Sequence, residues 1–159
     1  MEPILKVTGL SKAFSRAGRD TFFAVDHVSF EVQPGEILGI VGESGSGKST
    51  IARLITRQID ATGGQIFIDG QDITRLRGRD LIPVYAKIQM VFQSPADSFD
   101  PRRTLGDGIC ESLRNKGVPK AEREAKARAL LESCGLPAAF LARYPHQVSG
   151  GQCQRAAIA

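Results

Sequence analysis

The stretch "GESGSGKST", residues 42–50, decides the fold of this 159-residue chain. It matches the pattern G-x-x-x-x-G-K-[ST]. An unbroken apolar run, "ILGIV" (37–41), precedes it, and a helix-like run, "STIARLITRQI" (49–59), follows it. In a strand, glycine-rich turn and helix of this order, several backbone N–H groups and the positive helix end point at one anion. The stretch therefore predicts a phosphate-binding loop.

The loop supplies one group for each task in holding a nucleoside triphosphate. Lys48 is expected to reach the β- and γ-phosphates, and the Ser49 hydroxyl to hold Mg²⁺. A turn without a ligand is the alternative, but the flanking strand and helix agree with the motif. Kinases, GTPases and many ATPases share such a loop, so it does not choose a family by itself. The candidate residues are Gly42, Glu43, Ser44, Gly45, Ser46, Gly47, Lys48, Ser49 and Thr50.

The remaining pattern predicts a strand-rich first part and a helical second part. Alternation of Val28, Phe30 and Val32 is typical of a half-buried strand, and the run 37–41 of a strand buried on both faces of a parallel sheet. Further strands are expected over 4–10, 64–70 and 87–92, and helices over 49–59, 104–117 and 119–135. In the last helix, one apolar face would carry Ala127, Leu130, Leu131 and Cys134.

Composition narrows the class of partner. A formal net charge of +4 and a pI of about 9.2 favour an anionic partner. The absence of Trp and the presence of only two Tyr argue against nucleic acid, because bases need stacking partners. The three cysteines form no C-x-x-C pair, which argues against a disulfide framework or a zinc site and favours a reducing cytoplasm. No signal-peptide pattern and no apolar run long enough to span a membrane are present.

Two further motifs follow the loop in a fixed order. "MVFQSP" (90–95) places Gln93 after an apolar run, and "VSGGQCQR" (148–155) comes near the end of the chain. Together with the phosphate loop, they resemble the nucleotide-binding subunit of ABC transporters. Gln93 matches that family's Q-loop glutamine, which senses water and Mg²⁺, and Phe14 matches the aromatic residue that stacks on adenine. The family's signature motif corresponds to Val148, Ser149, Gly150, Gly151 and Gln152.

The resemblance is closer to one subgroup and carries several implications. "QMVFQSPADSFDPRRT" (89–104) is similar to the stretch found in importers of oligopeptides, dipeptides and nickel. The fold implied is α/β: a P-loop NTPase with a parallel core sheet, an N-terminal antiparallel β-subdomain and a helical subdomain. Residues 1–92 would form the ATP-binding core and β-subdomain, and residues 93–159 the Q-loop and the helical subdomain ending in the signature helix.

The family also implies cofactors, partners and a place in the cell. ATP and Mg²⁺ are expected, with Ser49 and Gln93 at the metal, and ATP hydrolysis would drive transport. The partners would be a second ATP-binding subunit, membrane permease subunits and, indirectly, an extracytoplasmic solute-binding protein. In such a dimer, Ser149, Gly150, Gly151 and Gln152 would serve the nucleotide of the other subunit. The chain would sit peripherally on the cytoplasmic face of the cell membrane.

The resemblance also predicts an incomplete cassette. In the family, an apolar strand ending in Asp-Glu and a switch histidine follow the signature helix, and these would lie beyond Ala159. The chain is therefore expected to be truncated and inactive alone, with no catalytic base of its own. Asp69 does end the apolar run "IFID", but Gly70 makes this a turn, and the family has a β-turn there rather than its metal aspartate.

Several alternatives stay open at this point. Gln93 could simply close a strand, and Phe14 could belong to the core, with Phe22 and Phe23 as competitors for stacking. Ser149 and Gln152 also form an S-x-x-Q capping box, which needs no ligand but is compatible with one. Cys153 stands where the family usually has Arg, and no role is assigned to it. For the whole chain, the alternatives are a nucleotide-binding fragment without ATPase activity and an ABC ATPase outside transport.

Overall fold

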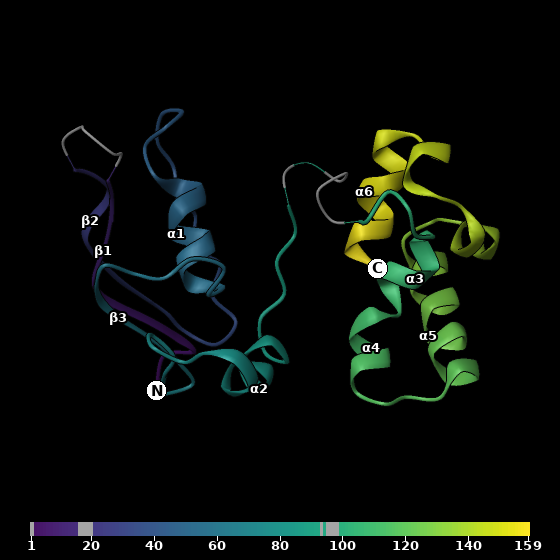
Figure 1. Ribbon diagram of the computed structural model, residues 1–159, viewed down its shortest axis with the longest axis horizontal. Helices are drawn as coiled ribbons and strands as arrows, with labels where there is room; N and C mark the ends of the chain where they lie inside the picture. The colour runs from purple at the N-terminus through teal and green to yellow at the C-terminus, as the bar shows by residue number, and fades with distance from the viewer. Residues whose placement is uncertain (1, 16–20, 93, 95–98) are drawn as a thin grey trace. The chain divides into compact units, whose positions relative to one another are not determined.

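The computed structural model describes residues 2–15, 21–92, 94 and 99–159. They form two compact units, Met1–Met90 and Val91–Ala159 (Figure 1). Gln93 lies outside the described residues. The functional division into an ATP-binding core and a helical subdomain stays a prediction.

The first unit is built on a four-stranded antiparallel sheet in the order β2-β1-β3-β4. Its strands are β1 Leu5–Phe14, β2 Phe22–Val32, β3 Gly63–Ile68 and β4 Gln71–Asp72. Val28, Phe30 and Val32 are half-buried and alternate with exposed residues, which confirms the predicted face of β2. The predicted turn after β3 is also present, with Asp69 at φ 47° and Gly70 at φ 75°.

One helix packs on this sheet. Helix α1 spans Lys48–Ile55, four residues shorter at its end than predicted, because Arg57 adopts a left-handed conformation with φ 56°. The 3-10 helix η1 (Gly78–Leu81) and the short helix α2 (Ile82–Tyr85) complete the unit. The core joins both sheet and helices through Val7, Leu10, Val25, Ile51, Leu54, Ile66, Ile68, Ile73, Leu81 and Val84.

The predicted strands over 37–41 and 87–92 are not formed. Both segments run without strand structure, and every strand pairing among the described residues is antiparallel. Ile37 is 96% exposed and Val41 92% exposed, although both were expected to be buried on a parallel sheet. A parallel strand is stabilised by hydrogen-bonded neighbours on its two sides, and none of the described strands pairs with these segments.

The second unit is helical. Helices α3 (Leu105–Ile109) and α4 (Glu111–Asn115) replace the single helix predicted over 104–117, with Cys110 as the joint between them. The predicted third helix is α5, Lys120–Ser133, and Gly135 with φ 68° follows its C-cap, Cys134. Two 3-10 helices, η3 (Ala138–Ala142) and η4 (Pro145–Gln147), lead to α6 (Gly150–Ile158).

The core of the second unit gathers one residue or more from α3, α5, η3 and α6. Its buried members are Leu105, Leu131, Leu136, Phe140 and Ala156. Ala127 and Leu131 of α5 are fully buried, as the helical spacing predicted. Leu130, assigned to the same face, is instead 42% exposed. Among the described residues, no helix is both long enough and apolar enough to cross a membrane.

A contact between β1 and β3 gives the first testable prediction. Gly64 has φ 83°, and a Cβ there would lie 2.4 Å from the Gly9 carbonyl oxygen. Gly35 has a similar φ of 79° but nothing within 4 Å. Gly35→Ala should therefore cost only the left-handed strain of about 1–2 kcal/mol, and Gly64→Ala clearly more. Urea denaturation measures both, and equal losses would show that this contact does not limit the sheet.

Candidate functional site

The predicted phosphate loop curls around the ammonium group of Lys48. Lys48 Nζ donates hydrogen bonds to the carbonyl oxygens of Gly42 (2.8 Å) and Glu43 (2.5 Å) and to Ser46 Oγ (3.3 Å). A turn with Ser46 N donating to Glu43 O at 3.2 Å closes the loop. The sequence motif thus brings the one basic side chain of the loop to its centre, at the start of α1.

The end of the loop is fixed against β2. Gly47 precedes α1 with φ 94°, and a Cβ on it would lie 2.2 Å from the Ala24 carbonyl oxygen. Any side chain at this position would therefore push the helix start away from the strand. No side chain caps α1, so the N–H groups of its first turn keep no partner within the helix. Backbone donors, a helix dipole and an ammonium group meet at one point, which suits an anion.

Phe14 lies at the end of β1 opposite Phe22 of β2. Their rings stack with centroids 5.7 Å apart, and Lys12 Nζ lies 5.2 Å from the centre of the Phe14 ring. Phe14 is 37% exposed, so it is not a core residue. Phe22 is two residues from Ala24, which at the rise of a strand places the pair within about 7 Å of the loop contact along β2. The partnership with Phe22 and Lys12 was not predicted.

The assignment of Ser49 and Gln93 to a metal ion stays a prediction. Ser49 is exposed at the start of α1, while Gln93 lies outside the described residues. The Asp69 carboxylate is paired with a side chain of the protein, because it accepts a hydrogen bond from Lys87 Nζ at 2.7 Å. Within the described residues, no group of three or more His, Cys, Asp or Glu side chains is placed to hold a metal ion.

The signature stretch begins α6 through the capping box that its sequence predicted. Gln152 N donates to Ser149 Oγ at 3.3 Å, and Ser149 N donates to Gln152 Oε1 at 2.9 Å. The box satisfies the third N–H group of the helix. The N–H groups of Gly150 and Gly151 come before it and lie outside the helical ladder. Both glycines are exposed, and a Cβ on either would meet nothing within 4 Å.

Two residues behind the capping box hold α6 in its unit. Arg155 Nη1 donates to the carbonyl oxygens of Cys134 (3.3 Å) and Gly135 (3.0 Å), just beyond the end of α5. Cys153 is buried, and burial raises the pKa of its thiol. No role for Arg155 was predicted from the sequence. The sequence signal that could have indicated such a role is a basic residue directly before the apolar run "AAIA" (156–159).

Comparison with known proteins decides the family. The family model for "ABC transporter" matches residues 25–159. The chain belongs to the ABC transporter family. The resemblance read from the three motifs is therefore confirmed, since the match includes both the phosphate loop and the signature stretch.

Among curated proteins, the chain is similar to ATP-binding proteins of import systems. It is 44% identical over 158 residues to a putative peptide import ATP-binding protein of Brucella ovis, covering 99% of this chain and 50% of that protein. It is 45% identical over 166 residues to the glutathione import ATP-binding protein GsiA of Salmonella choleraesuis, covering 99% and 26%. The chain thus spans 50% of the length of the first relative and 26% of the length of the second.

Solved structures show the same fold. The ATP-binding cassette MJ0796, a dimer in a post-hydrolysis state bound to ADP and Pi, superimposes with a TM-score of 0.88 at 30% identity, covering 97% of this chain and 67% of that one. CbiO1 of Clostridium perfringens, part of the ABC transporter complex cbiONQ, gives 0.78 at 25% identity, covering 99% and 60%. The α/β fold class of an incomplete P-loop NTPase, with its antiparallel β-subdomain and helices, is confirmed. The one part of the prediction that is not formed is the parallel core sheet, because the described part of the chain contains no parallel strand pairing.

The capping box gives the second prediction. Ser149→Ala removes the acceptor of the Gln152 N–H group and should lower the free energy of unfolding by about 1 kcal/mol. Ser112→Ala in α4 is the matched control, because Ser112 is an exposed serine inside a helix and should change stability by less. Thermal unfolding followed by circular dichroism compares them. Equal effects would mean that the box does not stabilise α6.

Proposed function

We propose that this chain is the ATP-binding part of an ABC-type import ATPase, which couples ATP binding and hydrolysis to transport of peptides. The observation that carries the proposal is the loop closed around Lys48 at the uncapped start of α1. The relatives named for peptide and glutathione import support the direction and the cargo. A peripheral position on the cytoplasmic face of the membrane, beside permease subunits, follows from that role.

The loop would bind the triphosphate through groups already in place. The N–H groups of the loop and of the first turn of α1 would face the phosphates, and Lys48 Nζ would exchange carbonyl oxygens for phosphate oxygens. Ser49 would offer its hydroxyl to Mg²⁺, which when bound neutralises charge on the β- and γ-phosphates. Phe14 would stack on adenine from the strand end, where its ring is half-exposed beside Phe22.

The signature stretch would act on a second subunit's nucleotide. Gly150 and Gly151 have no steric reason to be glycine inside their own unit. Glycine at such positions allows a ligand to approach the backbone closely. Their N–H groups, together with Ser149 and Gln152, would therefore receive the γ-phosphate held by the partner. A dimer is consistent with the similar cassette MJ0796, whose structure is dimeric.

Binding and hydrolysis are separate in this proposal. In a cassette of this family the water-activating glutamate would follow the helix that starts at Gly150, so we expect residues 1–159 to bind ATP without supplying the base. Gln93 would link the nucleotide to the helical unit as the Q-loop glutamine. Phosphoryl transfer without a group that orients the attacking water is slow, so turnover would belong to a cassette that contains that glutamate.

ATP binding gives the third prediction. Lys48→Ala should weaken binding of a fluorescent ATP analogue at least about tenfold, because a charge-assisted contact is lost. Lys116→Ala removes an exposed charge from the helical unit and should leave affinity unchanged. Fluorescence titration of the 159-residue chain measures both. If Lys48→Ala binds as tightly as Lys116→Ala, the loop is not the nucleotide site.

Phosphate release gives the fourth prediction. The purified 159-residue chain should release phosphate from ATP at the background rate, and Lys48→Ala should do the same. Turnover above background that disappears in Lys48→Ala would overturn the separation of binding from hydrolysis.

The cargo is tested in the source organism. Disrupting the gene should reduce uptake of a radiolabelled dipeptide while uptake of radioactive nickel continues. Loss of nickel uptake alone would make the system a nickel importer, and loss of neither would favour an ABC ATPase outside transport.

A further inference from the structure

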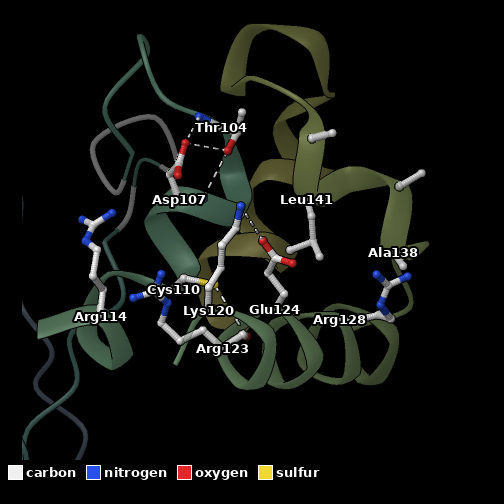
Figure 2. A pocket seen from close by; sticks show the side chains of 13 residues that line it. Thr104, Asp107, Cys110, Arg114, Lys120, Arg123, Glu124, Arg128, Ala138 and Leu141 are labelled. Carbon is white, nitrogen blue, oxygen red and sulfur yellow. Dashed lines mark hydrogen bonds and ion pairs between the residues drawn. The ribbon is translucent and has the colours of Figure 1, made fainter. Parts of the chain in front are cut away.

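The helical unit contains a pocket that the nucleotide site does not use. It has a volume of about 620 Å³ and is formed by α3, α4, residues 120–128 of α5, and η3. Figure 2 shows its lining from close by. The lining residues are Thr104, Gly106, Asp107, Cys110, Arg114, Lys120, Arg123, Glu124, Arg128, Ala138, Ala139, Leu141 and Ala142. A cavity of this size suits a small organic molecule.

The two acidic residues of the lining are already engaged. Thr104 Oγ1 donates a hydrogen bond to Asp107 Oδ2 at 2.8 Å, which lowers the pKa of that carboxyl group. The Asp107 carboxylate also accepts from Thr104 N in the capping box of α3. Glu124 pairs with Lys120 at 3.6 Å, one turn earlier on α5. The Asp107 carboxylate stays ionised, and the positive charge of Arg114 also lowers its pKa. The two acidic residues thus offset part of the charge of the four basic residues in the lining.

The remaining charge in the pocket is positive. Among the described residues, the guanidinium groups of Arg123 and Arg128 have no ion-pair or hydrogen-bond partner. Arg114 pairs with Glu111 at 3.4 Å, an exposed contact worth little. Arg114 and Arg123 extend on the same side of Cys110 (Figure 2), and both act electrostatically on its thiol. Two guanidinium groups are thus directed to one end of the pocket.

The side of the pocket formed by η3 is apolar. The backbone of α3 approaches η3 so closely that a Cβ on Gly106 would lie 2.8 Å from the Leu141 carbonyl oxygen. Beside this contact, Ala138, Ala139 and Ala142 present only methyl groups. The wall therefore offers a smooth surface for a flat or aliphatic group, next to planar cations that bind carboxylate or phosphate oxygens in pairs.

We propose that this pocket binds a small organic anion, with its phosphate or carboxylate group at Arg114 and Arg123 and its apolar body against Leu141 and the alanines. The basic side of the lining matches the anionic group of such a ligand, and the apolar side matches its body. Arg128, farther along α5, lies near Ala138 at the other end of the pocket (Figure 2). The site is independent of the nucleotide loop, so the proposal stands or falls without the proposed function.

Cys110 provides the assay, because its half-buried thiol lies beside Arg114 and Arg123 (Figure 2) and donates weakly to the Arg123 carbonyl oxygen at 3.6 Å. Burial raises the pKa of this thiol, so the alkylation is run at mildly alkaline pH with neutral iodoacetamide. Peptide-resolved mass spectrometry follows Cys110 and Cys134 in the same unmutated chain. Phenyl phosphate is the probe, benzoate tests a carboxylate in its place, and inorganic phosphate tests the anion alone.

Phenyl phosphate should slow modification of Cys110 and leave Cys134 unchanged. Arg123→Gln should raise the phenyl phosphate concentration needed for half-protection about tenfold, because a charge-assisted contact is lost. Lys126→Gln is the matched control, since Lys126 lies on the same helix, pairs with Glu122 at 2.7 Å and is not part of the lining. Stronger protection by phenyl phosphate than by benzoate identifies a phosphate ligand, and the reverse order a carboxylate ligand.

Three results would overturn the proposal. The first is no protection of Cys110 by millimolar phenyl phosphate or benzoate. The second is equal protection by inorganic phosphate, which would mean an adventitious ion and no use of the apolar wall. The third is equal weakening in Arg123→Gln and Lys126→Gln, which would reduce the effect to the general charge of α5. Unchanged circular dichroism of both variants shows that the helix is intact.

Discussion

The contact between Gly47 and the carbonyl oxygen of Ala24 constrains the first unit most tightly. At 2.2 Å from a would-be Cβ, it leaves no room for any residue but glycine. It fixes where α1 begins relative to β2, and through β2 it fixes the distance to Phe22 and Phe14. The loop and the uncapped helix start are therefore held close to β2, the strand that pairs Phe22 with Phe14 of β1. Lys48, the first residue of α1, then closes the loop from within.

A different device positions the signature helix. The capping box defines its first turn, while Arg155, nearer its end, binds the carbonyl oxygens that follow α5. These carbonyls lie at the negative end of α5, which favours a cation. Helix α5 also carries the basic side of the pocket in the same unit, so the capping box, the arginine contact and the pocket share one scaffold. This common scaffold is a structural fact about the unit, independent of what either site binds.

The sequence predicted motifs and local elements better than long-range pairing. The strands of the antiparallel sheet, the capping box and the stop at Gly135 follow from alternation, spacing and turn chemistry within a few residues. The segments 37–41 and 87–92 were predicted as strands from their apolar runs alone, yet strand structure depends on partners elsewhere in the chain. Leu130 was placed on the buried face because it has the right spacing, although the neighbouring elements cover only Ala127 and Leu131. The Lys48 contacts within the loop and the role of Arg155 depend on side-chain positions that spacing does not specify.

The glycines of the two motifs differ in what requires them, and this difference separates packing from recognition. Gly47 is required from inside, because β2 occupies the space a side chain would need. Gly150 and Gly151 have open space around them within their unit, so packing there gives no reason for glycine. Glycine is also a weaker helix former than alanine, so helix propensity gives no reason for the two glycines at the start of α6. Neither packing nor helix propensity therefore accounts for glycine at these two positions. Exposed N–H groups at a helix start are instead suited to binding an anion.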